Sequence, residues 1–408
     1  MKSDKSTAMT ILARLLNPAW LIGVSAFLIP LLTVYIPLSL AVMLPVGVAS
    51  AIVCRVATGR PRFRPDPMSA VLLAGFVILA ACSVAWSYSA DVTLDKLPRT
   101  AAIAVLGILF VAALNGLDDR ARKTVICCFV SGVAAALFFV VTERFSGGVF
   151  IHTSLAETSP NVFLNQFNRP LSILSIFIWP AAIKLAQIRR RYGVTAIVAT
   201  FIMFLAFQTS AAIAAVALGA TAGACVYIAP RIATLAIGSV IAASIILAPT
   251  IQGALPPPKQ IFETLDLPRS AYHRLLIWQF AAAKIEERPL LGWGFNGSRE
   301  IPGGKDNLDA SEAALPLHPH NAAMQWRLEL GILGALFGAG LFVTATESAR
   351  RRAKGRIEQA GAVAAVTSAF TIAMLSFGIW QSWWMSGLYL VAGFTALVCR
   401  DEPSAATE

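Results

Sequence analysis

The sequence has few charged residues and few cysteines for its length, and each shortage narrows the possible classes of protein. Asp, Glu, Lys and Arg make up only 13% of the 408 residues, whereas soluble domains contain about 25%. Hydrophobic residues reach 57%, with a mean hydropathy of +0.69, which excludes a soluble enzyme and an intrinsically disordered chain. The six cysteines lie in or at the ends of apolar segments, which excludes a disulfide framework. We therefore expect an integral membrane protein that lies in the lipid bilayer.

The net charge of +11 could suggest binding to nucleic acid, so the positions of the basic residues matter. They form short clusters between apolar segments, at residues 60–64, 120–123, 189–191 and 350–356. All these clusters fall on one side of the membrane when the amino terminus is placed in the cytoplasm, as the positive-inside rule requires. We therefore predict cytoplasmic termini, a first span retained as an anchor rather than cleaved, and no nucleic-acid partner.

Twelve apolar segments have about the length of a transmembrane helix, which is roughly 20 residues. They are residues 18–34, 37–54, 67–86, 98–115, 124–142, 170–187, 193–208, 211–229, 232–250, 321–346, 360–378 and 381–399. We predict an all-α integral membrane protein with about 12 transmembrane helices. Its parts are helices 1–9 in residues 1–250, a large external loop in residues 251–320, and helices 10–12 with a short tail in residues 321–408.

The external loop 251–320 is the best candidate for function, because long loops on a rigid scaffold often carry it. All four histidines of the chain, His152, His273, His318 and His320, lie in predicted external loops. Within the long loop we predict a helix capped by Ser270 that runs to about residue 288 and stops at Pro289. This helix is too charged to span, so we expect it in the membrane interface.

The loop ends in His318-Pro319-His320-Asn321, and the tenth span follows at once. Asn321, Gln325 and Glu329 recur at intervals of four and therefore share one face of the helix. Arg327 lies toward the opposite flank, where it could pair with Glu329 or with a lipid. Polar groups at this depth are costly in lipid, so we expect the stripe to face a cavity.

These residues resemble the O-antigen ligase family, whose members also include O-antigen and capsule polymerases. The resemblance is carried by Trp86-Ser87, by Arg274 to Trp278 with residues 289–294, and by His320-Asn321 with Gln325, Glu329, Gly331 and Gly334. It implies a GT-C-like membrane glycosyltransferase that acts at the periplasmic face of the inner membrane, without metal or other cofactor. The implied donor is a glycan on undecaprenyl pyrophosphate. The acceptor is a sugar hydroxyl of lipid A–core in the ligases and another lipid-linked repeat unit in the polymerases.

The resemblance implies that His320 is the catalytic base and that Arg274 binds the diphosphate leaving group. A neutral imidazole can accept the proton of a sugar hydroxyl, and a guanidinium binds phosphate oxygens as a permanent, bidentate cation. His318 is the second candidate for the base. We expect it to contact the substrate, together with the polar residues of the tenth span, Asn321, Gln325, Arg327 and Glu329.

One part of the sequence departs from the family pattern. The family often has a second arginine in a Ser-Arg-Gly-like element at the start of a middle span. Here the corresponding residues are Thr209, Ser210 and Ala211, with alanine in place of the arginine. Arg169, at the external start of the sixth span, is our candidate for a substitute, because a helix amino terminus also favours anions.

Two other functions remain possible from the sequence. A polymerase would use the same chemistry with a different acceptor, and the motif set favours the ligase. A transporter of lipid-linked glycans would also have many spans. However, the two halves show no internal repeat, and the intramembrane polar residues gather near one external loop, as an enzyme acting on one side requires.

Overall fold

We describe the fold from a computed structural model, which describes residues 18–59, 65–149, 164–267, 269–309 and 312–400. These residues are almost entirely helical. One short antiparallel pair of strands, β1 (Asn307–Asp309) and β2 (Glu312–Ala313), lies among them. Ten of the described helices are long and apolar enough to cross a membrane. The predicted class, an all-α integral membrane protein, is confirmed.

The ten candidate spans include two that contain a short 3-10 turn, η1 (Pro37–Ser39) before α3 and η2 (Ser83–Ala85) after α4. The helices are α2 (Pro18–Tyr35), α3 (Leu40–Ala57), α4 (Pro67–Cys82), α5 (Ala90–Asn115), α6 (Asp119–Ser146), α9 (Asn168–Ile188), α11 (Ser210–Ile228), α16 (Ala322–Arg352), α17 (Arg356–Leu375) and α18 (Ser382–Cys399).

Two further predicted spans are helices of less than the expected length. The segments 193–208 and 232–250 correspond to α10 (Arg190–Leu205) and α12 (Pro230–Ile246), which have 16 and 17 residues. At a rise of 1.5 Å per residue these helices are about 25 Å long, whereas the hydrocarbon core is about 30 Å thick. Length therefore explains why α12, which is apolar, is not among the ten candidate spans. The helix α10 is short as well, and its first turn carries Arg190 and Arg191.

The centre of the bundle is α9, in which every residue from Pro170 to Ile183 is buried. A helix that is hydrophobic on all sides is expected in the core of a large protein. The indole Nε1 of Trp179 donates to Ser368 Oγ at 2.7 Å, and that hydroxyl donates to the main-chain oxygen of Ala215 at 2.7 Å. This buried chain of hydrogen bonds joins α9, α17 and α11.

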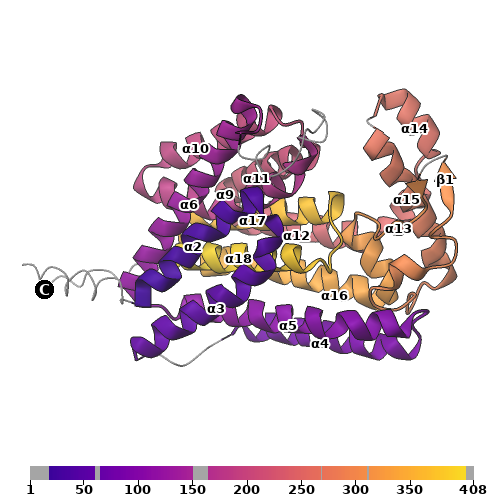
Figure 1. The fold of residues 1–408 in the computed structure, drawn as a ribbon, viewed down its shortest axis with the longest axis horizontal. Coiled ribbons are helices and arrows are strands. Elements are labelled where there is room, and N and C mark those ends of the chain that lie inside the picture. Colours follow the sequence, from indigo (N-terminus) through magenta and orange to yellow (C-terminus); the bar gives the residue numbers. More distant parts are fainter. Residues whose placement is uncertain (1–17, 60–64, 150–163, 268, 310–311, 401–408) are drawn as a thin grey trace, which may run out of the picture.

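The segment between α12 and α16 forms a group of short elements at one end of the bundle (Figure 1). Its helices are α13 (Ala248–Gly253), α14 (Pro258–Leu265), α15 (Arg269–Glu287) and the 3-10 turn η3 (Gly297–Glu300). The predicted helix in this loop is confirmed as α15. It begins at Arg269, so Ser270 lies in its first turn and the prediction that Ser270 is its N-cap was wrong.

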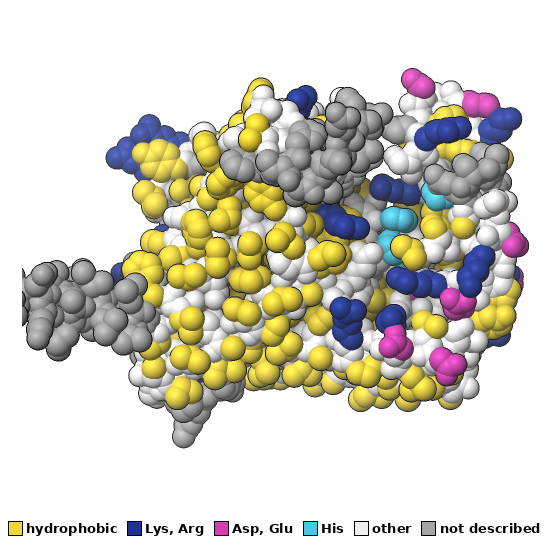
Figure 2. All heavy atoms as spheres, viewed as in Figure 1, with side chains coloured by type: hydrophobic (Ala, Val, Ile, Leu, Met, Phe, Trp, Pro, Cys, Tyr) yellow, Lys and Arg dark blue, Asp and Glu magenta, His cyan; other side chains and the backbone are white. Residues whose placement is uncertain are grey.

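The surface matches a bundle embedded in lipid. In Figure 2, hydrophobic side chains cover the middle of the visible face, while Lys and Arg side chains lie mainly toward its two ends. Such a band is expected where side chains face the hydrocarbon core, and charged side chains are expected near the two headgroup regions.

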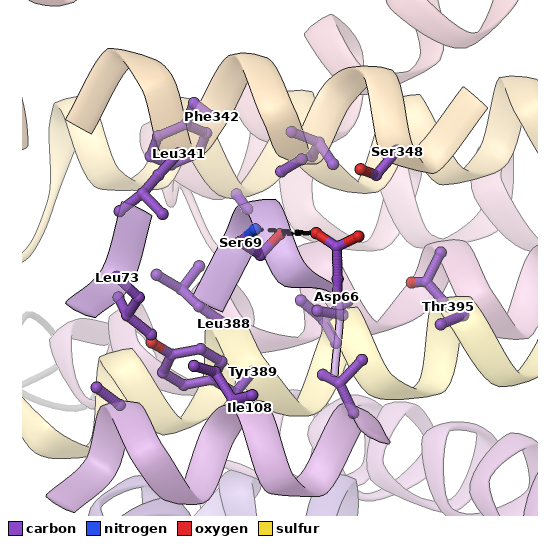
Figure 3. A pocket seen from close by; sticks show the side chains of 18 of the residues that line it. Asp66, Ser69, Leu73, Ile108, Leu341, Phe342, Ser348, Leu388, Tyr389 and Thr395 are labelled. Atoms are coloured by element: carbon purple, nitrogen blue, oxygen red, sulfur yellow. Dashed lines mark hydrogen bonds between the residues drawn. The ribbon is translucent and has the colours of Figure 1, made fainter. Parts of the chain in front are cut away.

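A cavity of about 370 Å³ lies among α4, α5, α16, α17 and α18, and its lining is largely apolar (Figure 3). At one side of it the carboxylate of Asp66 caps α4 by accepting from the main-chain nitrogen of Ser69 at 2.9 Å. Neither His318 nor His320 lines this cavity. We therefore place the candidate site elsewhere.

Candidate active site

The stretches that carry the family resemblance are far apart in the sequence but lie together in the structure. Trp86 Nε1 donates to the main-chain oxygen of Leu291 at 3.0 Å. Gly294 lies so close to Ser87 that a Cβ at this glycine would be 2.2 Å from the serine hydroxyl oxygen. Its φ of +102° is also a conformation that favours glycine. The end of α4 and the loop 289–294 are therefore one packed unit.

The same loop fills a break in α16. Gly331 has φ +62° and ψ −154°, which interrupts the helix and leaves main-chain groups without their usual partners. The loop 289–294 supplies new partners: its N–H groups donate to the main-chain oxygens of Leu328 and Glu329, each at 2.9 Å. The main-chain nitrogen of Ile332 donates to the oxygen of Pro289 at 3.0 Å. The glycines of the loop 289–294 and Gly331 of α16 thus belong to one set of backbone hydrogen bonds, which joins the loop to the helix.

Glu329 is fully buried, and its carboxylate is held by four donors. The main-chain nitrogen of Asn296 lies at 2.7 Å and Gln325 Nε2 at 3.0 Å. The hydroxyl of Ser298 and the indole Nε1 of Trp380 each donate at 2.5 Å. A buried carboxylate with its oxygens fully satisfied is suited to hold structure together. Glu329 therefore joins the segment that contains η3, the helix α16 and the turn before α18.

His320 forms a hydrogen bond with the turn between α17 and α18. Its Nδ1 lies 2.6 Å from the main-chain oxygen of Ser376. A carbonyl oxygen can only accept, so Nδ1 must carry a hydrogen and Nε2 is left with its lone pair. The residue is also in the left-handed region, with φ +54°, which is uncommon for a side chain other than glycine. The fold therefore selects the tautomer that a general base acting through Nε2 needs.

The charge state of His320 agrees with this role. Burial lowers the pKa of His320 below its usual 6.5, and the positive charges of Arg274 and His273 lower it further. The hydrogen bond to Ser376 opposes these effects by stabilising the protonated ring. In Figure 2, histidine side chains reach the surface with Lys and Arg side chains on several sides. At neutral pH the imidazole is therefore neutral and lies near the positive charge of Arg274.

His318 is a different kind of residue, because N–H groups approach both of its ring nitrogens. The main-chain nitrogen of His320 lies 3.1 Å from Nδ1, and that of Gly378 lies 3.3 Å from Nε2. Gln381 Nε2 also lies 3.1 Å from the same ring nitrogen. Burial lowers the pKa of His318 to about 3, and the charges of His320, Arg299 and Arg274 contribute. His318 is thus neutral and poorly suited to act as the base.

Arg274 is half-buried on α15 and makes no hydrogen bond or ion pair with another described residue. Burial lowers its pKa, yet a guanidinium remains protonated at physiological pH. One turn along the helix, Trp278 Nε1 donates to the main-chain oxygen of Pro319 at 2.7 Å. This bond ties α15 to the segment that holds both histidines. Arg274 is therefore an unpaired cation next to the candidate base.

The polar stripe predicted on the tenth span holds the site in place. Asn321 is the N-cap of α16, and its side-chain oxygen accepts from the main-chain nitrogen of Met324 at 3.0 Å. Gln325 accepts from the main-chain nitrogen of Ile379 at 2.9 Å and donates to Glu329. Each of these side chains forms hydrogen bonds within the protein. Their contacts therefore orient α16 against the turn that forms hydrogen bonds with the two histidines.

Arg327 and Arg169 are not joined to this network. Arg327 does not pair with Glu329, and its buried Nε has no hydrogen-bond partner among the described residues. Arg169 is exposed in the first turn of α9 and makes no hydrogen bond or ion pair with a described residue. Ala211, at the place of the family arginine, is in the first turn of α11. His152 lies outside the described residues.

Three features of the site could not be read from the sequence. Ser376 acts through its main-chain oxygen, which any residue type would supply. Gln381 is one polar residue in a short turn, and no local pattern links it to residue 318. Arg299 stands in η3, close enough to lower the pKa of His318, and is exposed with no partner among the described residues. No group of three or more metal-ligating side chains occurs within the described part of the chain.

Comparison with known proteins relates this chain to a known family. The family model described as O-Antigen ligase matches residues 194–338, which run from α10 through the long loop and beyond the break in α16. The catalytic candidates, His320 and Arg274, both fall within the match. The resemblance inferred from the motifs is therefore confirmed.

Curated relatives extend the similarity to other parts of the chain. A Rickettsia conorii protein is 28% identical over 323 residues, which cover 76% of this chain and 75% of that protein. A Rickettsia felis protein is 29% identical over 287 residues, or 67% of each chain. A Rickettsia prowazekii protein is 39% identical over 138 residues, which span 32% of this chain and about a third, 34%, of that relative. The name of each begins "Putative polysaccharide ligase".

Proposed function

With its resemblance to the O-antigen ligase family confirmed, we propose that this chain is a membrane glycosyltransferase of the ligase type. It transfers a glycan from undecaprenyl pyrophosphate to a sugar hydroxyl of lipid A–core. The names of the Rickettsia relatives support glycan ligation in general. The particular donor and acceptor are those that the family resemblance implies.

The observation that carries this proposal is the bond between His320 Nδ1 and the Ser376 oxygen, at 2.6 Å. It leaves Nε2 free to take the proton of the acceptor hydroxyl. The hydroxyl oxygen then forms a bond to the anomeric carbon, and the bond from that carbon to the diphosphate oxygen breaks. The electron pair leaves with the diphosphate, so direct displacement inverts the configuration at the anomeric carbon.

Negative charge on the leaving diphosphate is stabilised by cations. Arg274 is proposed as the main one, because it is unpaired and lies close enough to His320 to lower the pKa of that residue. We propose Arg169 as the second cation, in place of the family arginine that is absent at Ala211. Fixed donors aimed at developing charge can each contribute about 3–4 kcal/mol to the barrier.

The remaining predicted site residues are assigned supporting roles. We propose that Asn321, Gln325 and Glu329 keep the substrate pocket in shape through the hydrogen bonds described above. His318 positions His320 and faces the substrate without taking a proton. Arg327, whose Nε lacks a partner in the described residues, is proposed to contact a phosphate of one lipid-linked substrate.

The proposed location is the bacterial inner membrane, with the site facing the periplasm and both termini in the cytoplasm. The clusters of basic residues support this orientation, because the order of the predicted spans assigns them to the side opposite the long loop. Lipid-linked glycans and the bilayer are the proposed partners.

The proposal is tested in a deletion strain of the source bacterium complemented with wild type or with His320→Ala. Lipopolysaccharide is then separated on a gel. We expect wild type to restore O-antigen on the core, and His320→Ala to leave the core bare although the protein is present in the membrane. Core bearing a single repeat unit in the deletion strain indicates a polymerase instead. An unchanged gel in the deletion strain contradicts a role in lipopolysaccharide.

A matched control separates loss of chemistry from loss of folding. Lys305→Gln removes an exposed charge from the same loop, where Lys305 pairs with Glu300 at 2.8 Å. We expect it to complement fully. Transfer by purified His320→Ala at the wild-type rate, with the same lipid-linked donor, would remove the basis of the proposal.

A further inference from the structure

At the end of the bundle opposite the long loop, cations from two separate turns contact Tyr227. The guanidinium of Arg190, from the turn between α9 and α10, lies over the Tyr227 ring at 4.6 Å from its centre. Arg356, at the start of α17, donates to the main-chain oxygen of Tyr227 at 3.3 Å. Tyr227 itself is at the end of α11, just before the turn into α12. The fold thus brings basic residues from distant parts of the sequence to one place.

A hollow of about 510 Å³ opens beside this turn. Its lining comes from the start of α12, the end of α16 and the start of α17, namely Ala229, Pro230, Arg231, Ile232, Arg350 and Gln359. Arg231 is exposed and forms no hydrogen bond or ion pair with another described residue. The hollow therefore offers a guanidinium whose hydrogen-bond donors are available to a ligand.

Nearby carboxylates do not neutralise this group of cations. Glu347 accepts from Arg350 and also from Arg351, so one carboxylate is shared between two guanidinium groups. Glu358 accepts from the side-chain amide of Gln187 at 3.1 Å. Positive charge therefore remains in excess around the hollow. An anion bound there would relieve the repulsion between cations.

The hollow is bordered by hydrocarbon as well as by charge. Ile228 and Ile232, on either side of the turn, have 74% and 75% of their surface exposed. Ile228 is the last residue of α11 and Ile232 lies in the first turn of α12, so both are expected near the bilayer interface. Exposed isoleucine next to unpaired arginine matches a molecule with an anionic head and apolar chains, whereas a free phosphate ion gains nothing from the isoleucines.

The length of α12 gives a reason for a lipid to bind at this position. With 17 residues α12 is about 25 Å long, which is shorter than the thickness of the hydrocarbon core, about 30 Å. Its first residues are therefore expected to lie inside the usual level of the headgroups. Arg231, the second residue of α12, is then drawn below the average level of the headgroups. The bilayer must thin at this position to match the short helix. An anionic headgroup bound to Arg231 there would neutralise the positive charge of its guanidinium.

We propose that this hollow binds the headgroup of an anionic phospholipid in the leaflet that carries the basic clusters, with acyl chains along Ile228 and Ile232. The headgroup phosphate contacts Arg231 and Arg350. The site is separate from the candidate active site and does not depend on the reaction assigned above.

The test uses the full-length protein in nanodiscs of phosphatidylcholine, with phosphatidylglycerol titrated in. Thermal unfolding and native mass spectrometry report binding. We expect phosphatidylglycerol to bind and to raise the unfolding midpoint. Arg231→Gln should weaken its binding about fivefold, the effect of roughly 1 kcal/mol per basic residue near an anionic membrane surface. Ile232→Ser is expected to weaken it as well, because it removes an apolar contact from an exposed position.

Arg120→Gln is the matched control, because Arg120 is an exposed arginine in the first turn of α6, outside the lining of the hollow. We expect it to bind phosphatidylglycerol as wild type does, and inorganic phosphate at the same concentration not to displace the lipid. Equal binding by wild type and Arg231→Gln overturns the proposal. So does an equal loss in Arg120→Gln, which would indicate diffuse surface charge, or displacement by inorganic phosphate, which would indicate a site for a free anion.

Discussion

The Nδ1 of His320 lies 2.6 Å from the main-chain oxygen of Ser376, although the two residues are separated by 56 positions in the sequence. In hydrolytic triads a carboxylate holds the base in the required tautomer. Here a neutral carbonyl does so, and it adds less negative charge beside the ring than a carboxylate would. Burial can therefore keep the pKa of His320 below its usual value, and the base is neutral before substrate binds.

The first prediction concerns the pH dependence of transfer. His320 must be neutral to act as a base, so kcat/KM is expected to fall as the pH drops through its lowered pKa, below 6.5. Arg274→Gln removes a positive charge that lowers this pKa. We call the fall of kcat/KM at low pH the acidic limb. We expect the acidic limb of the residual activity of Arg274→Gln to move to higher pH, measured as initial rates of glycan transfer by the purified protein.

The control for this shift is Lys305→Gln, which changes an exposed residue of the same loop. Its acidic limb should coincide with that of wild type. An acidic limb above pH 6.5 in wild type, or one that Arg274→Gln leaves in place, contradicts the assignment of the limb to His320.

The second prediction separates the two contacts of the His318 ring. A neutral imidazole has one hydrogen, so only one of its nitrogens accepts at a time. We assign the shorter main-chain contact, 3.1 Å from His320 N to Nδ1, as the hydrogen bond that fixes the His320 backbone. His318→Asn keeps an acceptor near the position of Nδ1, whereas His318→Gln keeps one near Nε2.

We expect His318→Asn to retain most of kcat, and His318→Gln and His318→Ala to lose about tenfold or more, because misplaced catalytic groups are costly. The KM for the donor should change little in all three variants. A larger loss in His318→Asn than in His318→Gln would assign the important contact to Nε2 and Gly378 instead.

The third prediction links His318 to stability. Its pKa is about 3 in the folded protein and 6.5 in the unfolded chain, so below pH 6.5 the unfolded state binds a proton that the folded state does not. Stability should fall as the pH drops from 7 to 5, by about 2 kcal/mol from this group. The thermal unfolding midpoint in detergent measures this fall. It should be smaller in His318→Asn, and an identical fall in both proteins would exclude His318 as its cause.

Much of the fold could be predicted from the sequence because apolar segments in a membrane protein report directly on helices. The helix α15 was predictable in the same way from Pro289 and the spacing of Arg274 and Trp278. The break in α16 at Gly331 was not, because the residues around it continue an apolar helical pattern. Its cause is the loop 289–294, which supplies hydrogen bonds from another part of the chain.

The same limit applies to the site. His320 and Arg274 were identified by residue type and order, which motifs preserve. The partner of His320 is a main-chain oxygen, and the polar stripe of α16 meets donors from η3 and from the turn before α18. Such pairings depend on how the helices pack. A single sequence therefore indicated candidate site residues, but it did not indicate that His318 is held as a neutral residue.

The fourth prediction concerns the cations that bind the leaving group. Arg274→Ala should lower kcat/KM by about a hundredfold or more, and Arg169→Ala should lower it by about tenfold or more if it replaces the missing family arginine. Arg299→Ala is the comparison, because Arg299 is exposed near His318 and has no partner in the described residues. Full activity of Arg169→Ala together with loss in Arg299→Ala would transfer the role of second cation to Arg299.

The last prediction tests the interlocked backbone of α16 and the loop 289–294. Gly331→Ala places a Cβ 2.1 Å from the main-chain oxygen of Leu290 and keeps a φ of +62° that alanine avoids. We expect the free energy of unfolding to fall by about 1–3 kcal/mol, together with loss of transfer, because the break that aligns the loop cannot form. Gly340→Ala is the control on the same helix. Its Cβ would meet Leu72 at an ordinary 3.5 Å, so we expect stability equal to or slightly above wild type. Equal thermal unfolding midpoints for the two variants would show that the break at Gly331 does not depend on glycine.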